Sequence, residues 1–273
     1  MLPGGVSEHM TMIAYDAGAS SYDLLTGRWS RLYIPTLLDQ AGVGVGHRVL
    51  DVATGTGEAA ILAASRVGAR GRVVGIDVSR PMLAVAAVKL AERPVVLLEM
   101  DAQALAFRDE SFDAVVCQLG LMFMPDAASA LQEWTRVLRS RSCLAVCVYA
   151  TPDRVPLYGI LMDELSRHLP DQRDLLYQPS ALADAEILDR LLAGAGLKAV
   201  RVIQETRVHQ FTSFDEYWHP FEAGGGRHGQ LYMRLSVAAR QDVQAAVRDR
   251  MARFFVNGRL EIAADVLFGA GER

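Results

Sequence analysis

The residues best suited to chemistry lie in one short stretch, residues 49–60. An apolar run around Asp51 predicts a buried strand, and Gly55 and Gly57 predict a tight turn after it. The alanine-rich run from Glu58 predicts a helix. A strand that turns sharply into a helix presents free backbone N–H groups and the positive end of a helix dipole, and glycines let a ligand approach that backbone. We therefore expect an anionic or strongly polar ligand here.

Two kinds of nucleotide ligand are bound in this way. Dinucleotide enzymes carry G-x-G-x-x-G after an apolar strand, with an acid about 20 positions later for a ribose hydroxyl. The segment Gly55-Thr-Gly57-Glu-Ala-Ala60 fits that spacing loosely, and Asp77 lies at about the expected distance. Asp51, however, lies inside the strand, where dinucleotide-binding strands are usually apolar. Asp51 therefore argues against a dinucleotide and favours the other kind of nucleotide-type ligand, which the next motif identifies.

The segment Asp51-Val-Ala53-Thr-Gly55-Thr-Gly57 resembles the first motif of the class I S-adenosylmethionine-dependent methyltransferases, acid-x-Gly-x-Gly-x-Gly. Alanine replaces the first glycine, as it does in the ubiquinone and menaquinone C-methyltransferases. The resemblance covers about residues 45–150. It implies S-adenosylmethionine as cofactor and S-adenosylhomocysteine as product, with Asp51 reaching the α-amino group. The cofactor-binding residues that it implies in this motif are Asp51, Ala53, Gly55, Thr56 and Gly57.

Polar residues also follow the next strands along the chain. Asp77 ends a predicted strand at 71–77, where its carboxylate can accept both ribose hydroxyls, although it could instead cap the helix that follows. Val78 comes next to it, and the resemblance implies that Met82 lies against the adenine face. Asp101-Ala102-Gln103 is similar to the family's acid-alanine pair beside the adenine amino group. Gln118 ends the fourth predicted strand and should point toward the transferable methyl group, unless it only caps the strand.

Two aromatic residues near the N-terminus are further candidates. The segment from Tyr22-Asp to Trp29 resembles the Tyr-Asp opening of quinone C-methyltransferases, whose N-terminal helices close over the cofactor. Because an aromatic face attracts a sulfonium cation, Tyr22 and Trp29 are predicted cofactor-binding residues. The alternative is that both residues pack their helices onto the sheet.

A histidine with a pKa near neutrality could remove a proton from the acceptor. His219 is the first candidate base because it lies in an aromatic cluster, His228 is the second, and His209 follows. The alternative is that a water molecule or an enolate suffices and no protein base takes part.

Composition limits the function classes. The chain has 273 residues, a net charge of −4 and a pI of about 5.9, which argues against a nucleic-acid-binding surface. No apolar run is long enough to span a bilayer, and the start lacks the features of a signal peptide. Cys117, Cys143 and Cys147 lack metal-site spacing, so we expect buried cysteines and no metal. We expect a cytoplasmic protein without membrane insertion, and a homodimer is a candidate assembly.

The predicted fold is α/β, a doubly wound Rossmann-like sheet of seven strands, parallel with one antiparallel edge strand near residues 260–268. N-terminal helices (1–41) would form a lid. Residues 42–210 and 259–273 would form the cofactor-binding core, with 151–179 partly in a cap. Residues 211–258 would be a helical cap insertion over the substrate, whose aromatic residues suit a flat or hydrophobic acceptor.

The sequence thus predicts a methyltransferase for a small molecule, acting by O- or C-methylation on a specialised metabolite or a quinone-like acceptor. Two alternatives remain. One is a protein that binds S-adenosylmethionine without methylating and promotes a cyclisation or rearrangement. The other is an NAD(P)-type oxidoreductase, which binding of S-adenosylhomocysteine against NAD would distinguish.

Overall fold

The computed structural model describes residues 19, 22–24 and 26–273. The strands within these residues are β1 (Arg48–Val52), β2 (Arg72–Asp77), β3 (Val95–Glu99), β4 (Phe112–Gln118), β5 (Leu138–Tyr149), β6 (Lys198–Phe211), β7 (Phe255–Val256) and β8 (Arg259–Glu272). The α-helices are α2 (Thr26–Ser30), α3 (Ile34–Gln40), α4 (Glu58–Val67), α5 (Arg80–Leu90), α6 (Ala127–Val137), α7 (Pro156–His168), α8 (Arg173–Tyr177), α9 (Ala185–Gly194), α10 (Phe214–Glu222), α11 (Gly226–Met233) and α12 (Val237–Met251). Short 3-10 helices are η1 (Tyr22–Leu24), η2 (Leu121–Phe123), η3 (Pro170–Gln172), η4 (Gln178–Leu182) and η5 (Ala252–Phe254).

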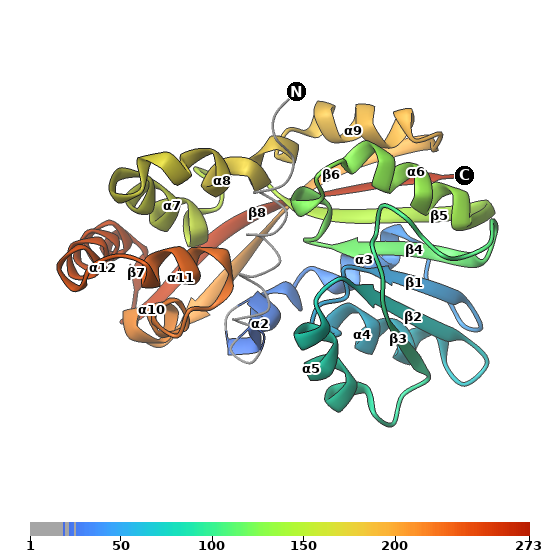
Figure 1. Ribbon diagram of the computed structural model, residues 1–273, viewed down its shortest axis with the longest axis horizontal. Helices are drawn as coiled ribbons and strands as arrows, with labels where there is room; N and C mark the ends of the chain where they lie inside the picture. The colour runs from blue at the N-terminus through green and yellow to red at the C-terminus, as the bar shows by residue number, and fades with distance from the viewer. Residues whose placement is uncertain (1–18, 20–21, 25) are drawn as a thin grey trace.

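All the strands belong to one twisted sheet. Its order is β3-β2-β1-β4-β5-β8-β6, and the two-residue β7 pairs with β8. Strands β1 to β5 pair with one another in parallel, because a crossover after each strand returns the chain to the same edge of the sheet. Helices α3, α4 and α5 cover one face and α6 and α9 the other (Figure 1). The predicted doubly wound α/β fold is confirmed.

One detail of the predicted sheet is wrong. The antiparallel strand β8 does not lie at the edge but between β5 and β6, and it is antiparallel to both. Strand β6 runs in the same direction as β5, and the space between these two strands is one strand wide. When β8 fills that gap, the backbone groups of both neighbours are hydrogen-bonded, which an edge position could not achieve.

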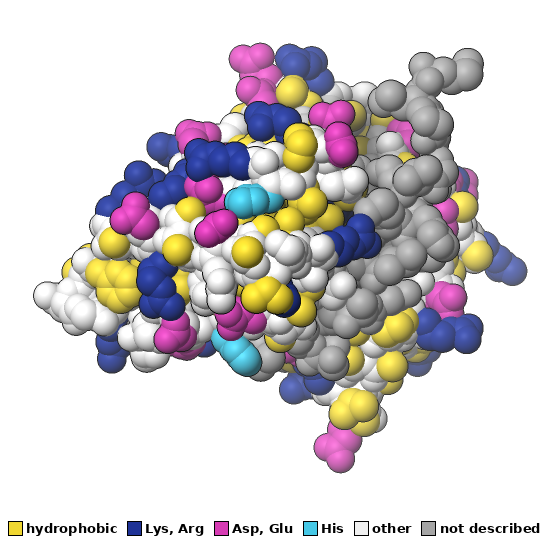
Figure 2. Space-filling view, turned by 60° about the vertical axis from the view of Figure 1, so that its left-hand side comes forward, with side chains coloured by type: hydrophobic (Ala, Val, Ile, Leu, Met, Phe, Trp, Pro, Cys, Tyr) yellow, Lys and Arg dark blue, Asp and Glu magenta, His cyan; other side chains and the backbone are white. Residues whose placement is uncertain are grey.

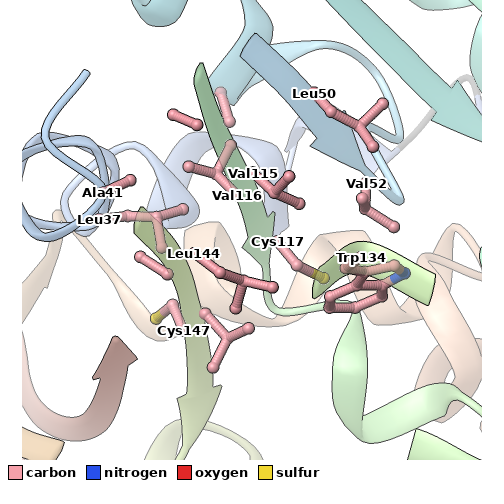
Figure 3. Packing of buried hydrophobic residues seen from close by; sticks show 14 of the residues in the cluster. Leu37, Ala41, Leu50, Val52, Val115, Val116, Cys117, Trp134, Leu144 and Cys147 are labelled. Atoms are coloured by element: carbon pink, nitrogen blue, oxygen red, sulfur yellow. The ribbon is translucent and has the colours of Figure 1, made fainter. Parts of the chain in front are cut away.

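The core lies between the sheet and its helices. Leu50 of β1, Cys117 of β4 and Leu144 of β5 are buried there, and Trp134 of α6 packs beside them (Figure 3). The prediction of buried cysteines is confirmed for Cys117 and Cys147, whereas Cys143 is half-buried. This close packing fixes the carboxyl ends of the central strands relative to one another.

A second apolar core lies beyond the sheet's parallel part. Strands β6 and β8 are each 14 residues long, and their paired outer ends carry buried Phe211, Leu260 and Ile262. Helices α7, α10, α11 and α12 contribute buried residues to this core, to the left in Figure 1. We call this part of the molecule the cap. It contains residues 211–258, the segment for which we predicted a cap insertion, and also α7 from the 151–179 segment.

The N-terminal region differs from the predicted lid. Much of residues 1–41 lies outside the described residues. Helix α3 begins at Ile34 with Pro35 in its first turn, where proline is tolerated, and it packs on β5 and β8 in the main core. Among the described residues of this region, η1 and α2 remain as candidates for a lid.

On the face shown in Figure 2, basic and acidic side chains are interspersed. Within the part of the chain that the structure describes, no helix combines the length and apolarity needed to cross a bilayer.

Candidate functional site

The glycine turn after β1 has the backbone that its sequence predicts. The dihedral φ is 54° at Ala53, 54° at Gly55 and 86° at Gly57, which is the N-cap of α4. A Cβ on Gly57 would lie 2.8 Å from the Leu90 side chain, so glycine lets the turn pack against α5. Ala53 adopts the left-handed region at a cost of about 1–2 kcal/mol, which the packed turn must offset.

A cavity of about 320 Å³ opens at the carboxyl ends of β1, β2 and β4. Ligands of doubly wound sheets bind beyond these ends. The described structure thus brings together residues that are far apart in the sequence. Ten of the fourteen predicted cofactor-binding residues line this cavity: Tyr22, Ala53, Gly55, Asp77, Val78, Met82, Asp101, Ala102, Gln103 and Gln118.

The carboxylate of Asp77 is held in place by backbone N–H groups. Gly55 N donates to its Oδ2 at 2.8 Å, and Ser79 N donates to its Oδ1 at 2.9 Å. Because a carboxylate oxygen can accept more than one hydrogen bond, a carboxylate oriented in this way can also accept from a ligand. Helix α5 has its own cap, since Ser79 Oγ accepts from Met82 N at 3.3 Å. The geometry therefore favours a ligand-binding carboxylate over a simple helix cap.

Asp51 is fully buried, and one of its two carboxylate oxygens lacks a hydrogen-bond donor among the described residues. Its Oδ2 accepts from Thr54 Oγ1 at 2.6 Å, while its Oδ1 has no hydrogen-bond partner among the described residues. Burial raises its pKa to about 7, against the opposing hydrogen bonds from Thr54 and the Ala60 N–H, and the charge of Asp77 adds to the rise. A buried acceptor without a donor is costly, so Asp51 is suited to a cationic or N–H-donating ligand.

Gln118 places a second unsatisfied oxygen in the same region. Its Nε2 donates to the carbonyl oxygen of Ser30 at 3.3 Å, and its buried Oε1 has no partner within the described chain. Asp51 and Gln118 both line a small cavity of about 30 Å³ next to the larger one. Two acceptors facing one small space can bind a single ammonium group.

The segment after β3 is fixed by α6 and its N-cap residue, Asp126. The indole Nε1 of Trp134 donates to the carbonyl oxygen of Ala102 at 2.8 Å, and Asp126 N donates to Gln103 Oε1 at 2.9 Å. Asp101 remains exposed, with its Oδ1 accepting from Gln103 N at 2.8 Å. The backbone of this cavity wall is therefore held in place, while the carboxylate of Asp101 is accessible to a ligand.

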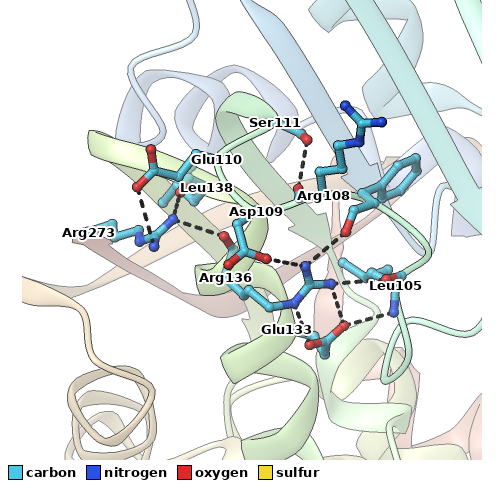
Figure 4. A network of polar contacts seen from close by, with 10 residues as sticks. Leu105, Arg108, Asp109, Glu110, Ser111, Glu133, Arg136, Leu138 and Arg273 are labelled. Atoms are coloured by element: carbon cyan, nitrogen blue, oxygen red, sulfur yellow. Dashed lines mark hydrogen bonds and ion pairs between the residues drawn. The ribbon is translucent and has the colours of Figure 1, made fainter.

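Arg136 connects the same loop to the rest of the core (Figure 4). Its guanidinium donates to the carbonyl oxygens of Leu105 and Phe107 at 3.0 and 2.8 Å and forms ion pairs with Asp109 and Glu133 at 2.7 and 2.8 Å. Glu133 in turn accepts from Leu105 N at 3.0 Å. These contacts hold the 101–109 segment against α6.

A third cavity, of about 70 Å³, lies between the sheet and the cap. Its lining is largely aromatic and apolar: Phe123, Tyr149, Tyr158, Met162 and Phe221 belong to it. Tyr22 and Leu119 line all three cavities. The cavities therefore meet at these two side chains.

His228 and Arg227 are the polar residues of the cap that reach this third cavity. His228 is half-buried and stacks on Tyr158, with ring centroids 5.4 Å apart, and its buried Nε2 has no partner among the described residues. Burial, assisted by the charge of Arg227, lowers the pKa of His228 to about 3. The guanidinium carbon of Arg227 lies 5.0 Å from the centre of the Phe123 ring. The cavity thus presents a neutral imidazole beside a buried cation.

Comparison with known proteins agrees with this geometry. The family model described as a methyltransferase domain matches residues 50–146. The aklanonic acid methyltransferase DauC of Streptomyces sp. (strain C5) is 31% identical over 208 residues, which are 69% of this chain and 91% of that protein. The chain belongs to the class I S-adenosylmethionine-dependent methyltransferases.

Other proteins are similar over shorter lengths or in fold alone. The ubiquinone/menaquinone biosynthesis C-methyltransferase UbiE of Marinomonas sp. (strain MWYL1) is 32% identical over 56% of this chain and 63% of that protein. The chain spans about half to just under two thirds of most such relatives. The YcgJ protein of Bacillus subtilis shares the fold, with a TM-score of 0.58 at 20% identity over 89% of this chain and 99% of that one.

The site of this methyltransferase fits S-adenosylmethionine. The unsatisfied oxygens of Asp51 and Gln118 suit the α-ammonium group of its methionine part, and the large cavity beside them has room and carboxylates for its adenosyl part. Thr56 lies in the small cavity, but its Oγ1 donates to Asp23 at 2.6 Å. Gly57 lines none of the three cavities and acts through the packing of the turn.

Three other predicted site residues, Trp29, His219 and His209, lie outside these cavities. Trp29 is buried in the cap core, with its ring 4.9 Å from that of Phe211, so the packing alternative describes it and cofactor contact does not. His219 is 73% exposed on α10 and its Nδ1 faces Glu222 at 4.0 Å, outside all three cavities. Helix α10 buries the aromatic residues that recur at helical spacing from Phe214 to Phe221, so this periodicity in the sequence already places His219 on the opposite, exposed face. His209 is also outside the cavities, hydrogen-bonded through Nε2 to Tyr33 at 2.7 Å.

The sequence reasoning missed several residues that line the cavity between the sheet and the cap. Tyr149 ends β5, so the rule that selected Asp77 and Gln118 at strand ends would have found it. Leu119 follows Gln118 with φ of 54°, an unusual conformation for leucine. Tyr158 and Arg227 gave no comparable signal, because the packing of the cap alone brings them to the cavity.

Proposed function

We propose that this protein transfers the methyl group of S-adenosylmethionine to a flat, largely apolar small molecule that lies between the sheet and the cap. The observation that carries this proposal is the meeting of the three cavities at Tyr22 and Leu119. A group transferred between two ligands must be reachable from both, and this junction is where the two binding spaces are in contact.

The proposed roles in cofactor binding follow from the contacts. Asp51 and Gln118 would accept hydrogen bonds from the ammonium group, and the oriented carboxylate of Asp77 would accept from the ribose hydroxyls. Asp101 would accept from the adenine amino group, and buried Met82 would lie against the ring. The bound cofactor supplies an electrophilic methyl group. The chain's own contribution is to orient both ligands and exclude water.

The chemistry of the second cavity indicates the class of acceptor. Phe123, Tyr149 and Tyr158 offer ring faces and edges to a planar molecule. The positive charge of Arg227 favours an acceptor atom that becomes anionic. The curated relatives named above belong to quinone biosynthesis or act on aklanonic acid, which supports a hydroxylated ring compound as acceptor.

His228 would accept a hydrogen bond from the acceptor's hydroxyl group. With a pKa of about 3 it is neutral at physiological pH, and its unpartnered Nε2 is buried at the cavity. A neutral imidazole can accept a proton, and the positive charge of Arg227 beside it favours an acceptor that ionises readily, such as an enol or a phenol. His228 thus replaces His219 as the leading candidate base.

Binding and turnover experiments test this proposal. Calorimetry should show binding of S-adenosylhomocysteine and none of NAD. Incubation with S-adenosylmethionine carrying a labelled methyl group and a set of hydroxylated aromatic and polyketide compounds should label at least one of them. Binding without transfer to any compound, including those in a metabolite extract of the source cells, would favour a non-methylating role. Absence of binding would refute the proposal altogether. A homodimer in the cytoplasm stays a prediction, which molar mass in solution and cell fractionation would test.

A further inference from the structure

The short helix η1 carries Tyr22, which lies at the junction of the three cavities. Three residues cannot form a stable helix by themselves, so contacts with the rest of the fold must hold η1 in place. Asp23, the neighbour of Tyr22, makes such contacts.

Both carboxylate oxygens of Asp23 are bound by the wall of the cofactor site. Oδ1 accepts from Thr56 Oγ1 of the glycine turn at 2.6 Å, and Oδ2 accepts from Lys89 Nζ of α5 at 2.8 Å. Lys89 Nζ also forms an ion pair with Glu58 in the first turn of α4 and lies 3.4 Å from Thr56 Oγ1. One ammonium group therefore joins η1 to the two helices that border the cofactor cavities.

The same cluster reaches α2. Arg31, just after that helix, binds Glu58 through two hydrogen bonds of 2.5 and 2.8 Å. The side chains of Asp23, Lys89 and Glu58 are 29%, 21% and 10% exposed. Solvent therefore screens these charges less than it would a fully exposed pair.

A glycine in α2 makes room for this arrangement. A Cβ on Gly27 would lie 2.2 Å from Asp23 Oδ1, much closer than atoms can approach. Glycine lowers the stability of a helix relative to alanine, yet here its lack of a side chain leaves space for the carboxylate. This packing is independent of the ion pairs and points to the same position of Asp23.

We propose that Asp23, Lys89 and Glu58 form a latch that positions Tyr22 over the junction of the cavities and holds bound cofactor in the site. These are positioning residues, because they act through Tyr22 and η1. The inference rests on the proposed function, since it assumes that the cavities bind S-adenosylmethionine. Lys89 suits the task because a compact ammonium group can approach the oxygens of three different residues. It is one of the chain's two lysines.

Binding of S-adenosylhomocysteine tests the latch without turnover. Lys89→Met should raise its Kd on the order of tenfold, mainly through faster dissociation, with little change in the melting temperature of the ligand-free protein. Lys198→Met is the matched control at the other lysine, an exposed residue at the start of β6, and should bind normally. Added salt should weaken binding by the wild type more than by Lys89→Met.

A double-mutant cycle shows whether Lys89 acts through Tyr22. Adding Lys89→Met to Tyr22→Ala should cost little further affinity, because the latch has lost the side chain that it positions. Gly27→Ala, which keeps every charge but displaces the Asp23 carboxylate, should speed dissociation like Lys89→Met. Equal losses in both backgrounds, or unchanged dissociation in Lys89→Met and Gly27→Ala, would overturn the latch. Failure of the wild type to bind at all would instead overturn the proposed function.

Discussion

Replacement of Asp51 by asparagine should make the ligand-free protein relatively more stable as the pH rises. Asp51 has a pKa of 3.8 in an unfolded chain and about 7 in the folded protein, where it is fully buried. The folded state therefore binds more protons between about pH 4 and pH 7, and the wild type loses stability as the pH rises through that window. Asparagine cannot ionise, so the variant does not share this loss.

The magnitude follows from the two pKa values. A tenfold difference in proton affinity equals about 1.4 kcal/mol, so the shift from 3.8 to about 7 corresponds to roughly 4 kcal/mol across the window. Asparagine brings its own cost, of about 1–3 kcal/mol, because its buried N–H groups lack acceptors where Asp51 Oδ1 now lies. That cost does not depend on pH. The change with pH of the difference in unfolding free energy between variant and wild type is therefore more informative than the sign of that difference at one pH.

Urea unfolding of both proteins at a series of pH values measures this slope. The free energy of unfolding of Asp51→Asn minus that of the wild type should increase by about 4 kcal/mol from pH 4 to pH 8. Asp113→Asn is a control of opposite sign. Although burial opposes it, hydrogen bonds from Arg48 N and Arg139 lower the pKa of Asp113. A difference for Asp51→Asn that stays constant with pH would refute the reasoning.

The remaining predictions concern the site and the cap. Asp77→Ala should weaken binding of S-adenosylhomocysteine about ten- to a hundredfold, through loss of charge-assisted hydrogen bonds; unchanged affinity in calorimetry would exclude the ribose role. His228→Phe keeps the ring stacked on Tyr158 but removes its acceptor, so turnover should fall while S-adenosylhomocysteine affinity stays the same. His219→Ala, on the exposed face of α10, should leave both quantities unchanged, and a loss of turnover would restore His219 as a candidate base. Trp29→Ala should lower the free energy of unfolding by about 3–5 kcal/mol because it leaves a cavity in the cap core, and a loss below 1 kcal/mol in urea unfolding would contradict that packing.

The amino-acid sequence determined the cofactor side of the site. Gly55, Asp77, Asp101 and Gln118 each follow or end a strand, and parallel strands of one sheet place their carboxyl ends at the same edge. Strand periodicity and turn chemistry are local properties of the sequence, so the convergence of these residues is predictable from the order of strands and turns along the chain. The fold class followed from the same pattern.

The tertiary structure alone decided the rest. The placement of β8 inside the sheet depends on hydrogen bonding to two strands distant in the chain. The assignment of Trp29 to the cap core and of His228 to a cavity depends on how separate helices pack. The raised pKa of Asp51 and the contacts of Asp23 with Lys89 likewise arise from segments that meet only after folding. Local sequence patterns specify which helices and strands form. The burial and protonation state of a given side chain depend instead on spatial neighbours that lie far away in the sequence.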